Sequence, residues 1–376
     1  MSTINTPCDL ALDAVKALLP YQPGKPIDEL ERELGLTNIV KLASNENPLG
    51  PSLLVKQAIE KSIDEVSLYP DGNGFALKQA LANKHGITSE MITLGNGSND
   101  VLDIIARVFL NEGREAIFSE YAFVVYAIAT QAVNATARVA KAKPLGGDDA
   151  YGHDLATMAE LLTDKTAVIF IANPNNPTGT WLEPAELETF IASVSKHIVV
   201  VLDEAYCEYL QPETAFDSMQ WLAHFPNLII TRTFSKAYGL AGLRVGYAVS
   251  QPAVADLLNR IRQPFNVNSI ALAAAEAALS DQAYIEQSRE LNQQGLQQLA
   301  DGFDRLGLAY IPSVGNFICV EVGGNSADVY QGLLKQGVIV RPVAAYNMPR
   351  HLRVSVGLAE QNIALLEALE TVLQGV

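Results

Sequence analysis

Four segments rich in polar residues each follow a short apolar run of the chain. They read GNGSN at 95–99, NPNNPTG at 173–179, DEAY at 203–206 and TFSK at 233–236. If the apolar runs form an open α/β sheet, ligands bind outside the carboxyl ends of its strands. We therefore expect the four segments to meet at one edge of a sheet and to form a single site.

The first two segments suit an anion and an aimed amide. Gly95 and Gly97 allow a tight turn, and free N–H groups where the next helix begins form an anion site. An ordinary glycine-rich turn is the alternative, since the segment matches neither the dinucleotide nor the P-loop pattern. In 173–179, two Asn-Pro pairs give a rigid loop that can aim an amide side chain.

The other two segments supply an acid and an amine. Asp203 ends a buried strand, where an acid is costly without a partner such as a cationic ring nitrogen or a nearby Arg. Lys236 is either a surface residue or a Schiff-base nucleophile, because burial or neighbouring cations lower a lysine pKa. The SxxK pattern at 193–196 lacks the companion motifs of a Ser-Lys hydrolase. Together, the four segments offer what a phosphate-bearing pyridine aldehyde requires.

Length and composition limit the class of protein. The chain has 376 residues, 49% of them hydrophobic, which suggests two domains and excludes wholesale disorder. The net charge of −16 argues against binding to nucleic acid or to anionic lipid. Scattered cysteines and histidines predict no metal site. With neither a signal peptide nor a membrane-spanning run in the sequence, we expect a cytoplasmic protein.

Helical and strand-like patterns alternate from about residue 50 to 265, which predicts an α/β fold with a doubly wound, mostly parallel sheet. The expected strands of this sheet are 91–94, 116–118, 167–172, 198–202, 228–231 and 244–249. The expected helices are 52–65, 75–84, 100–110, 122–132, 154–162, 184–195 and 252–262. Beyond it, we expect a long helical stretch, three strands and a final helix, at 269–306, 316–322, 338–341, 351–356 and 359–374. The predicted domains are an N-terminal arm with one helix (9–19), a large domain and a smaller α+β domain, at 1–30, 31–268 and 269–376.

The polar segments belong to a longer series of motifs. The series is LLPYQPGKP at 18–26, KLASNENPLGPS at 41–52, LYPD at 68–71, NPNNPTG at 173–179, DEAY at 203–206, TFSKAYGLAGLRVGY at 233–247 and LRVSVG at 352–357. In this order the chain resembles the fold-type I aminotransferases that depend on pyridoxal 5'-phosphate. Over essentially its whole length it is most similar to the histidinol-phosphate aminotransferase branch.

The resemblance implies a role for each matching residue. Lys236 would form the internal aldimine with the cofactor and then shuttle a proton between Cα and C4′. Asp203 would pair with the pyridine nitrogen, so that the ring acts as an electron sink. Asn176 and Tyr206 would hydrogen-bond the ring O3′. The cofactor phosphate would be held by Gly97, Ser98, Asn99, Thr233, Ser235 and Arg244.

The resemblance also implies a homodimer and a substrate pocket. Tyr69 would reach the phosphate of the partner subunit's cofactor, although an aromatic before Pro is often only a packed loop residue. Arg353 would grip the α-carboxylate of the substrate or its equivalent. Tyr21, Asn45 and Arg341 would line the substrate pocket, with a surface salt bridge as the alternative for Arg341.

The chain departs from the family where an aromatic ring should stack on the pyridine. The family usually has a Pro-Thr-aromatic segment, but this chain reads SEYAFVVY at 119–126. Aligning Tyr126 with the family's downstream aromatic makes Phe123 the stacking ring. Tyr121 is the alternative.

The resemblance implies ping-pong transamination between histidinol phosphate and 2-oxoglutarate, with glutamate as product, in histidine biosynthesis. An aromatic amino acid aminotransferase on the same scaffold is a close alternative, and a pyridoxal-phosphate decarboxylase is a less favoured one. A cofactor-binding regulator would need a DNA-reading module, for which the chain has neither spare length nor a basic helix.

Overall fold

A computed structural model describes residues 6–21, 23–147 and 149–375 of the chain. Its largest sheet has the strand order β2-β8-β7-β6-β5-β3-β4, and β8 alone runs against its neighbours. The strands are β2 (Ile92–Gly95), β3 (Glu115–Ser119), β4 (Thr136–Ala140), β5 (Thr166–Ala172), β6 (Val199–Asp203), β7 (Leu228–Thr233) and β8 (Gly246–Ser250). This is the mostly parallel, doubly wound α/β sheet that the sequence predicts.

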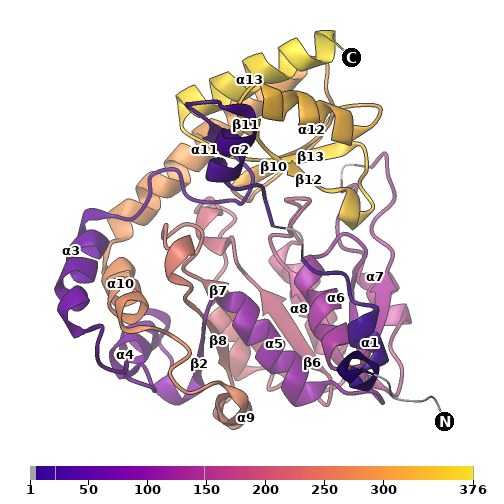
Figure 1. Cartoon of the computed structure of the whole chain (residues 1–376). Helices are drawn as coiled ribbons and strands as arrows, with labels where there is room; N and C mark the ends of the chain where they lie inside the picture. Colours follow the sequence, from indigo (N-terminus) through magenta and orange to yellow (C-terminus); the bar gives the residue numbers. More distant parts are fainter. Residues whose placement is uncertain (1–5, 22, 148, 376) are drawn as a thin grey trace.

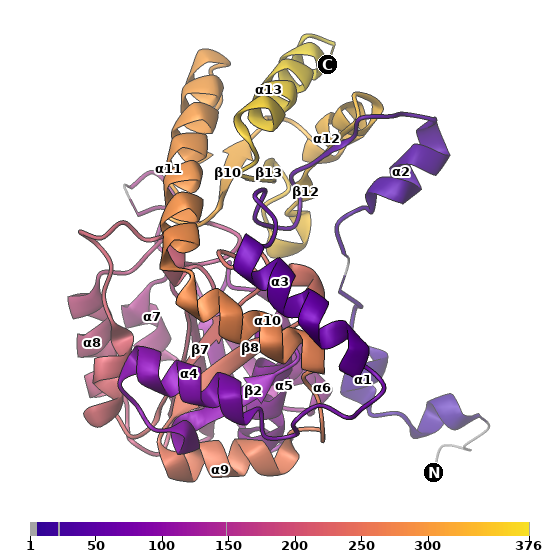
Figure 2. The same cartoon turned by 90° about the vertical axis from the view of Figure 1, so that its left-hand side faces the viewer.

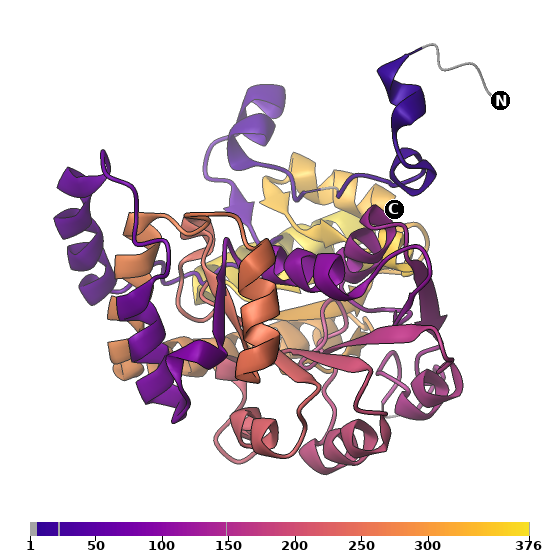
Figure 3. The ribbon, with the colours of Figure 1, turned by 90° about the horizontal axis from the view of Figure 1, so that it is seen from below.

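Helices cover both faces of this sheet, because its central strands are apolar on both sides (Figure 1). Ile169 and Ile171 of β5 enter one core, whereas Val168 and Phe170 enter the core on the opposite face. The first core is shared with α3 (Leu53–Ser62), α4 (Phe75–His85), α7 (Leu155–Glu160), α8 (Pro184–Ser193) and α10 (Ser269–Ser280). The second is shared with α5 (Ser98–Phe109), α6 (Val124–Ala132) and α9 (Pro252–Ile261), and α9 lies beside α5 (Figure 3). Such two-sided burial explains the continuous apolar runs of these strands.

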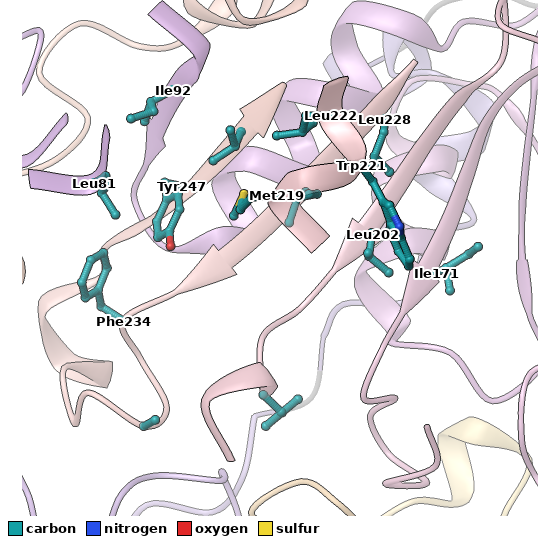
Figure 4. Close-up of a cluster of buried hydrophobic side chains, with 14 of the residues drawn as sticks. Leu81, Ile92, Ile171, Leu202, Met219, Trp221, Leu222, Leu228, Phe234 and Tyr247 are labelled. Carbon is teal, nitrogen blue, oxygen red and sulfur yellow. The ribbon is translucent and has the colours of Figure 1, made fainter. Parts of the chain in front are cut away.

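Figure 4 shows part of the first core. Trp221 and Met219 of the turn η5 (Ser218–Ala223) lie among Leu202, Leu222 and Leu228 at the sheet. All five side chains are at most 4% exposed. The packing fixes the strands that end at the polar segments, so the position of those segments follows from the core.

The C-terminal part of the chain forms a second, antiparallel sheet with the order β12-β13-β10-β9. Its strands are β9 (Tyr310–Ile311), β10 (Phe317–Glu321), β12 (Arg341–Pro342) and β13 (His351–Ser355). Three helices pack on it around a separate core: α11 (Gln282–Arg305), α12 (Ser326–Lys335) and α13 (Ala359–Gln374). In Figure 2, α11 rises from α10 to join the two parts.

A short strand near the N-terminus lies with the C-terminal part. β1 (Val40–Lys41) pairs in parallel with β11 (Val338–Ile339), although residue 40 falls within the range 31–268 expected for the large domain. The domain boundaries themselves stay a prediction.

Several expected elements differ in the structure. Helix 269–306 is two helices, because Asp281 interrupts it and its side chain accepts a hydrogen bond from the Tyr284 N–H at the start of α11. The single helix expected at 9–19 is instead a 3-10 turn, η1 (Pro7–Leu10), and α1 (Asp13–Lys16), and η1 stands away from the body (Figures 2 and 3). The sequence patterns do not predict strand β4, helix α2 (Ile27–Leu34) or helix α12. β4 is the edge strand and is largely exposed, so it has no apolar run to mark it.

Candidate active site

The polar segments meet around one cavity of about 160 Å³ at the carboxyl ends of β5, β6 and β7. The C-terminal sheet closes its other side. The lining residues are Tyr21, Ser44, Asn45, Ser98, Asn99, Phe123, Ala172, Pro174, Asn176, Asp203, Ala205, Tyr206, Thr233, Ser235, Lys236, Arg244, Tyr346 and Arg353. The expectation that these segments converge is thus confirmed.

Asp203 is a buried acid held by two hydroxyl groups. The Tyr126 hydroxyl donates to Oδ2 at 2.8 Å, and the Thr231 hydroxyl donates to Oδ1 at 2.9 Å. Burial raises the pKa of the Asp203 carboxyl to about 6, against these two hydrogen bonds, which lower it. Within the described residues it forms no ion pair, so no cation of that part of the chain balances its charge.

The neighbouring acid has the partner that Asp203 lacks. Glu204 points to the other side of the strand end, and the Arg232 guanidinium contacts its Oε2 through Nε at 2.9 Å and Nη2 at 2.8 Å. The ion pair considered for Asp203 in the sequence therefore belongs to Glu204. Asp203 faces the cavity, where a cationic group of a ligand would pair with it.

Lys236 lies in the same cavity with a lowered affinity for its proton. Its amine donates to the Ser44 carbonyl oxygen at 2.9 Å. Burial, together with the charges of Arg353 and Arg244, lowers the pKa of Lys236 to about 7. A substantial fraction of this amine is therefore neutral, and nucleophilic, near neutral pH.

An anion cup lies where α5 begins. Its first N–H groups, from Ser98 onward, have no partner inside the helix and attract an anion. Arg244 closes the cup, because its Nη1 donates to Ser235 Oγ at 3.3 Å. Gly97 has φ +83°, and a Cβ there would lie 2.4 Å from Arg244 Nη2. The positive φ favours glycine at this position, and glycine leaves room for the guanidinium. Backbone N–H groups beside a guanidinium suit a compact anion such as phosphate.

Amide and guanidinium groups form the opposite wall. The Asn45 amide donates to the Tyr206 hydroxyl at 3.0 Å, and burial raises the pKa of Tyr206 to about 12, so this hydroxyl keeps its proton. Arg353 is 6% exposed and donates to Asn176 Oδ1 and, at 2.8 Å, to the Ala43 carbonyl. Its Nε is buried and has no hydrogen-bond partner among the described residues. A bound oxyanion would satisfy this group.

Arg341 lies next to the cavity but does not line it. It is the cross-strand neighbour of Arg353, so the two side chains leave the sheet on the same face. Its guanidinium lies 5.3 Å from the ring centre of Tyr21, which does line the cavity. Arg341 thus lies at the outer edge of the cavity, separated from it by the exposed side chain of Tyr21.

The structure separates the two rings considered for stacking. Phe123 lines the cavity, whereas Tyr121 packs outside it against Tyr151, with ring centres 5.2 Å apart. This placement favours Phe123. Tyr69 lies outside the cavity of its own chain, 84% exposed, and stacks on Phe265.

The sequence does not reveal four polar residues that act in the site: Tyr126, Thr231, Ser44 and Tyr346. Tyr126 had a usable signal, since it follows Phe123 by three residues at a helix start, where i and i+3 share a face. Ser44 acts through its backbone carbonyl, which has no side-chain signature. Tyr346 reaches the cavity from the loop between β12 and β13, 140 residues beyond Tyr206 in number but close in space.

The arrangement suits an aromatic ligand that carries both a phosphate and a protonatable ring nitrogen. The cup at α5 would take the phosphate, Asp203 the ring nitrogen, and Lys236 a carbonyl carbon. Among the described residues, no cluster of His, Cys, Asp and Glu is placed to hold a metal ion. No helix in that same part of the chain is both long and apolar enough to cross a membrane.

Comparison with known proteins agrees with this chemistry. Residues 37–369 match the family described as aminotransferase class I and II. Proteins named histidinol-phosphate aminotransferase 2 from Pseudomonas fluorescens Pf0-1 and Pseudomonas aeruginosa PAO1 are 58% and 57% identical, each over 97% of this chain and 97% and 98% of their own. A crystal structure of histidinol-phosphate aminotransferase from Sinorhizobium meliloti with pyridoxal-5'-phosphate has a TM-score of 0.87 and 29% identity, covering 96% of this chain and 97% of that one.

Proposed function

This chain belongs to the class I and II aminotransferases, in the histidinol-phosphate aminotransferase family, and we propose that it transfers the amino group of histidinol phosphate to 2-oxoglutarate. The cofactor is pyridoxal 5'-phosphate, the pathway is histidine biosynthesis, and we place the enzyme in the cytoplasm. When bound, the cofactor supplies a carbonyl that bonds to amines and a ring that withdraws electrons from the substrate Cα.

One observation carries the choice of substrate. The cavity has two separate cationic places, Arg244 at the cup of α5 and Arg353 on β13, with Arg341 beside the latter. In a chain of net charge −16, such paired local cations are what a doubly charged phosphate needs. The first place suits the phosphate of the cofactor. The second suits the phosphate of the donor and then the α-carboxylate of 2-oxoglutarate, since a guanidinium pairs with either oxyanion.

The remaining groups orient the reaction and move protons. We propose that the Asp203 carboxylate pairs with the ring nitrogen of the cofactor and keeps that nitrogen protonated. Asn176 and Tyr206 would hydrogen-bond the ring O3′. Phe123 would cover one face of the ring and exclude water. Lys236 has a pKa lowered to about 7, so its neutral amine would attack the carbonyl carbon of the cofactor. The same amine would then carry the proton lost from the substrate Cα.

The decisive experiment compares kcat/KM for histidinol phosphate, phenylalanine, tyrosine and aspartate, with 2-oxoglutarate as acceptor. We expect histidinol phosphate to exceed the other donors by roughly tenfold or more, the equivalent of one charge-assisted hydrogen bond. Equal or faster turnover of phenylalanine would instead identify an aromatic amino acid aminotransferase. Release of carbon dioxide in place of glutamate would identify a decarboxylase.

Substitutions of Arg353 and Arg341 should affect the two half-reactions differently. Arg353→Ala should damage both half-reactions, because both oxyanions would use this guanidinium. Arg341→Ala should mainly weaken the phosphorylated donor, by about 1.5–3 kcal/mol in kcat/KM if a charge-assisted bond is lost. Single-turnover rates with histidinol phosphate and with 2-oxoglutarate measure each half separately. Arg350→Ala is the matched control, since Arg350 is exposed and pairs with Glu321 outside the cavity. An Arg341 variant that loses equally with both substrates would contradict this assignment.

We also propose that the active unit is a homodimer with shared sites. Large apolar side chains are exposed along α3 and the segment after it, and such a patch marks an interface. These residues are Leu53, Leu54, Ile63, Val66, Leu68 and Tyr69. Tyr69 is in this patch and outside its own cavity, which supports a contact with the cofactor phosphate of the partner subunit.

Mixed dimers test this sharing. Lys236→Ala chains and Tyr69→Phe chains should each be impaired alone, the first in turnover and the second in cofactor binding. A heterodimer of the two contains one site with Lys236 and the intact Tyr69 of the other chain, so it should regain the activity of about one site in two. Differently tagged chains allow the heterodimer to be purified and assayed. If purified heterodimers show no recovery, Tyr69 does not act across subunits.

A further inference from the structure

The loop that carries Tyr69 is connected by a series of hydrogen bonds to the anion cup of its own subunit. Asp100, in the first turn of α5, accepts from the Asn96 N–H at 2.8 Å and from the Asn266 amide at 2.7 Å. Asn266 also donates to the Leu94 carbonyl at 3.2 Å, at the end of β2. The segment that follows α9 is therefore fixed to the loop that forms the cup.

Arg262 carries this connection to the loop of Tyr69. Its Nη1 donates to Asn266 Oδ1 at 2.8 Å, and its Nη2 donates to the Gly72 carbonyl at 2.8 Å. Its Nε donates to Asn259 Oδ1 at 3.2 Å. The guanidinium is half-buried and forms no ion pair within the described residues. Its planar fork is hydrogen-bonded on three sides to neutral oxygens and thus joins two loops, with the carboxylates of Asp100 and Asp71 near enough to favour its charge.

Phe265 completes the support from the same segment. Its ring stacks on the ring of Tyr69 with centres 4.8 Å apart. A Cβ at Gly72 would lie 3.1 Å from the Phe265 ring, so the loop presents bare backbone to it. Phe265 has φ +58°, a conformation that costs a non-glycine residue about 1 kcal/mol or more and persists only where neighbours impose it. The hydrogen bonds of Arg262 and Asn266 on either side impose it here.

We propose that Arg262 is a positioning residue for the cofactor site of a second copy of this chain, because it holds the loop that presents Tyr69. This inference rests on the proposed function, in which Tyr69 contacts the cofactor phosphate across the dimer. Its distinctive consequence is directional. Loss of Arg262 weakens the site of the other subunit, whereas the cup of its own subunit keeps the bond between Asn266 and Asp100.

Heterodimers with a single Lys236 test the direction. One chain carries Lys236→Ala, so the cofactor absorbance linked to lysine reports only the site of the other chain. In the first arrangement Arg262→Met is placed in the Lys236→Ala chain, and in the second it is placed in the chain that retains Lys236. We expect the Kd for pyridoxal 5'-phosphate to rise roughly tenfold or more in the first arrangement, as for a lost phosphate contact, and to stay within about twofold in the second.

Two controls in the first arrangement separate the possible failures. Tyr69→Phe should weaken cofactor binding as Arg262→Met does. Arg260→Met should not, since Arg260 is exposed on α9 and its ion pair, among the residues that the structure describes, is with Asp256. If Tyr69→Phe has no effect, the shared site of the proposed function is wrong. If Tyr69→Phe weakens binding and Arg262→Met does not, only the role of Arg262 is wrong.

A structural role alone would give a different pattern. If Arg262→Met merely destabilised its own subunit, the loss would be equal in both arrangements or greater in the second, and that result overturns the inference. Should Arg262→Met chains fail to assemble, Arg262→Lys is measured in the same two arrangements. It keeps the positive charge but has a single nitrogen in place of the two terminal nitrogens that reach Asn266 and Gly72. The expected and the contradicting results are therefore the same.

Discussion

Replacing Lys236 by alanine should reduce turnover by roughly 10⁴-fold or more, while the protein still folds and still binds pyridoxal 5'-phosphate. The loss is large because one side chain would serve both as nucleophile and as proton carrier. Binding should survive because the cup at α5, Asp203 and the stacking ring of Phe123 do not depend on this amine. The lowered pKa of Lys236, caused by burial and by Arg353 and Arg244, is the physical basis for its reactivity near neutral pH.

Borohydride reduction followed by peptide mapping checks the assignment directly. In the unsubstituted enzyme, reduction should fix the cofactor on the peptide that contains Lys236, and the Lys236→Ala protein should retain none after denaturation. Lys196→Ala is the control, because Lys196 is exposed beyond the end of α8 and also completes the Ser-Lys pattern at 193–196. If the cofactor is fixed on any other peptide, or if Lys196→Ala abolishes activity, the assignment of Lys236 as the reactive lysine is wrong.

The position of this lysine was predictable because it depends on local sequence. A buried strand must end where its apolar run ends, and the chain leaves a parallel sheet at the edge where ligands bind. Asp203 is the last residue of β6, and Lys236 lies three residues after the end of β7. The alternation of strands and helices therefore placed both residues in one cavity without knowledge of any long-range contact.

What the sequence could not decide depends on pairs distant along the chain. Whether Asp203 or Glu204 takes an arginine depends on which side of the strand end each faces and where Arg232 arrives from β7. The hydroxyl of Tyr126 reaches Asp203 from a helix 77 residues earlier. Arg341, expected in the substrate pocket, lies at the edge of the cavity, paired across strands with Arg353 and 5.3 Å from the ring centre of Tyr21. The i, i+3 spacing of Phe123 and Tyr126 hints at a shared helix face, but no local pattern names Asp203 as the partner of Tyr126 or Glu204 as the partner of Arg232.

Asp203→Asn should lower kcat by roughly 10²–10³-fold, the cost of removing a preorganised charge that stabilises the transition state. The carboxylate would keep the ring nitrogen protonated, and an amide cannot hold that proton. The fold should remain intact, since the variant is isosteric. Glu204→Gln is the matched control: the same chemical change on the adjacent acid, which pairs with Arg232 away from the cavity, should leave kcat near normal. Near-normal kcat in Asp203→Asn would make the electron-sink role untenable.

The same variant should reveal how much the ionised Asp203 carboxylate lowers the free energy of unfolding of the cofactor-free protein. Burial raises the pKa of Asp203 from 3.8 to about 6, so between these values the unfolded chain loses a proton that the folded chain keeps. The wild type therefore loses stability as pH rises through this window, by about 3 kcal/mol in total, and Asp203→Asn does not. Urea unfolding of both cofactor-free proteins at pH 4, 5, 6 and 8 should show the variant gaining on the wild type up to about pH 6 and no further. Tyr126 and Thr231 donate to different oxygens of Asp203, and the NH2 group that replaces one of these oxygens in the variant cannot accept. A constant offset is therefore expected, and only the change with pH is diagnostic. If the difference in free energy of unfolding between the two proteins is the same from pH 4 to 8, burial does not destabilise the ionised carboxylate. The argument that this carboxylate pairs with a cationic ring nitrogen would then fail.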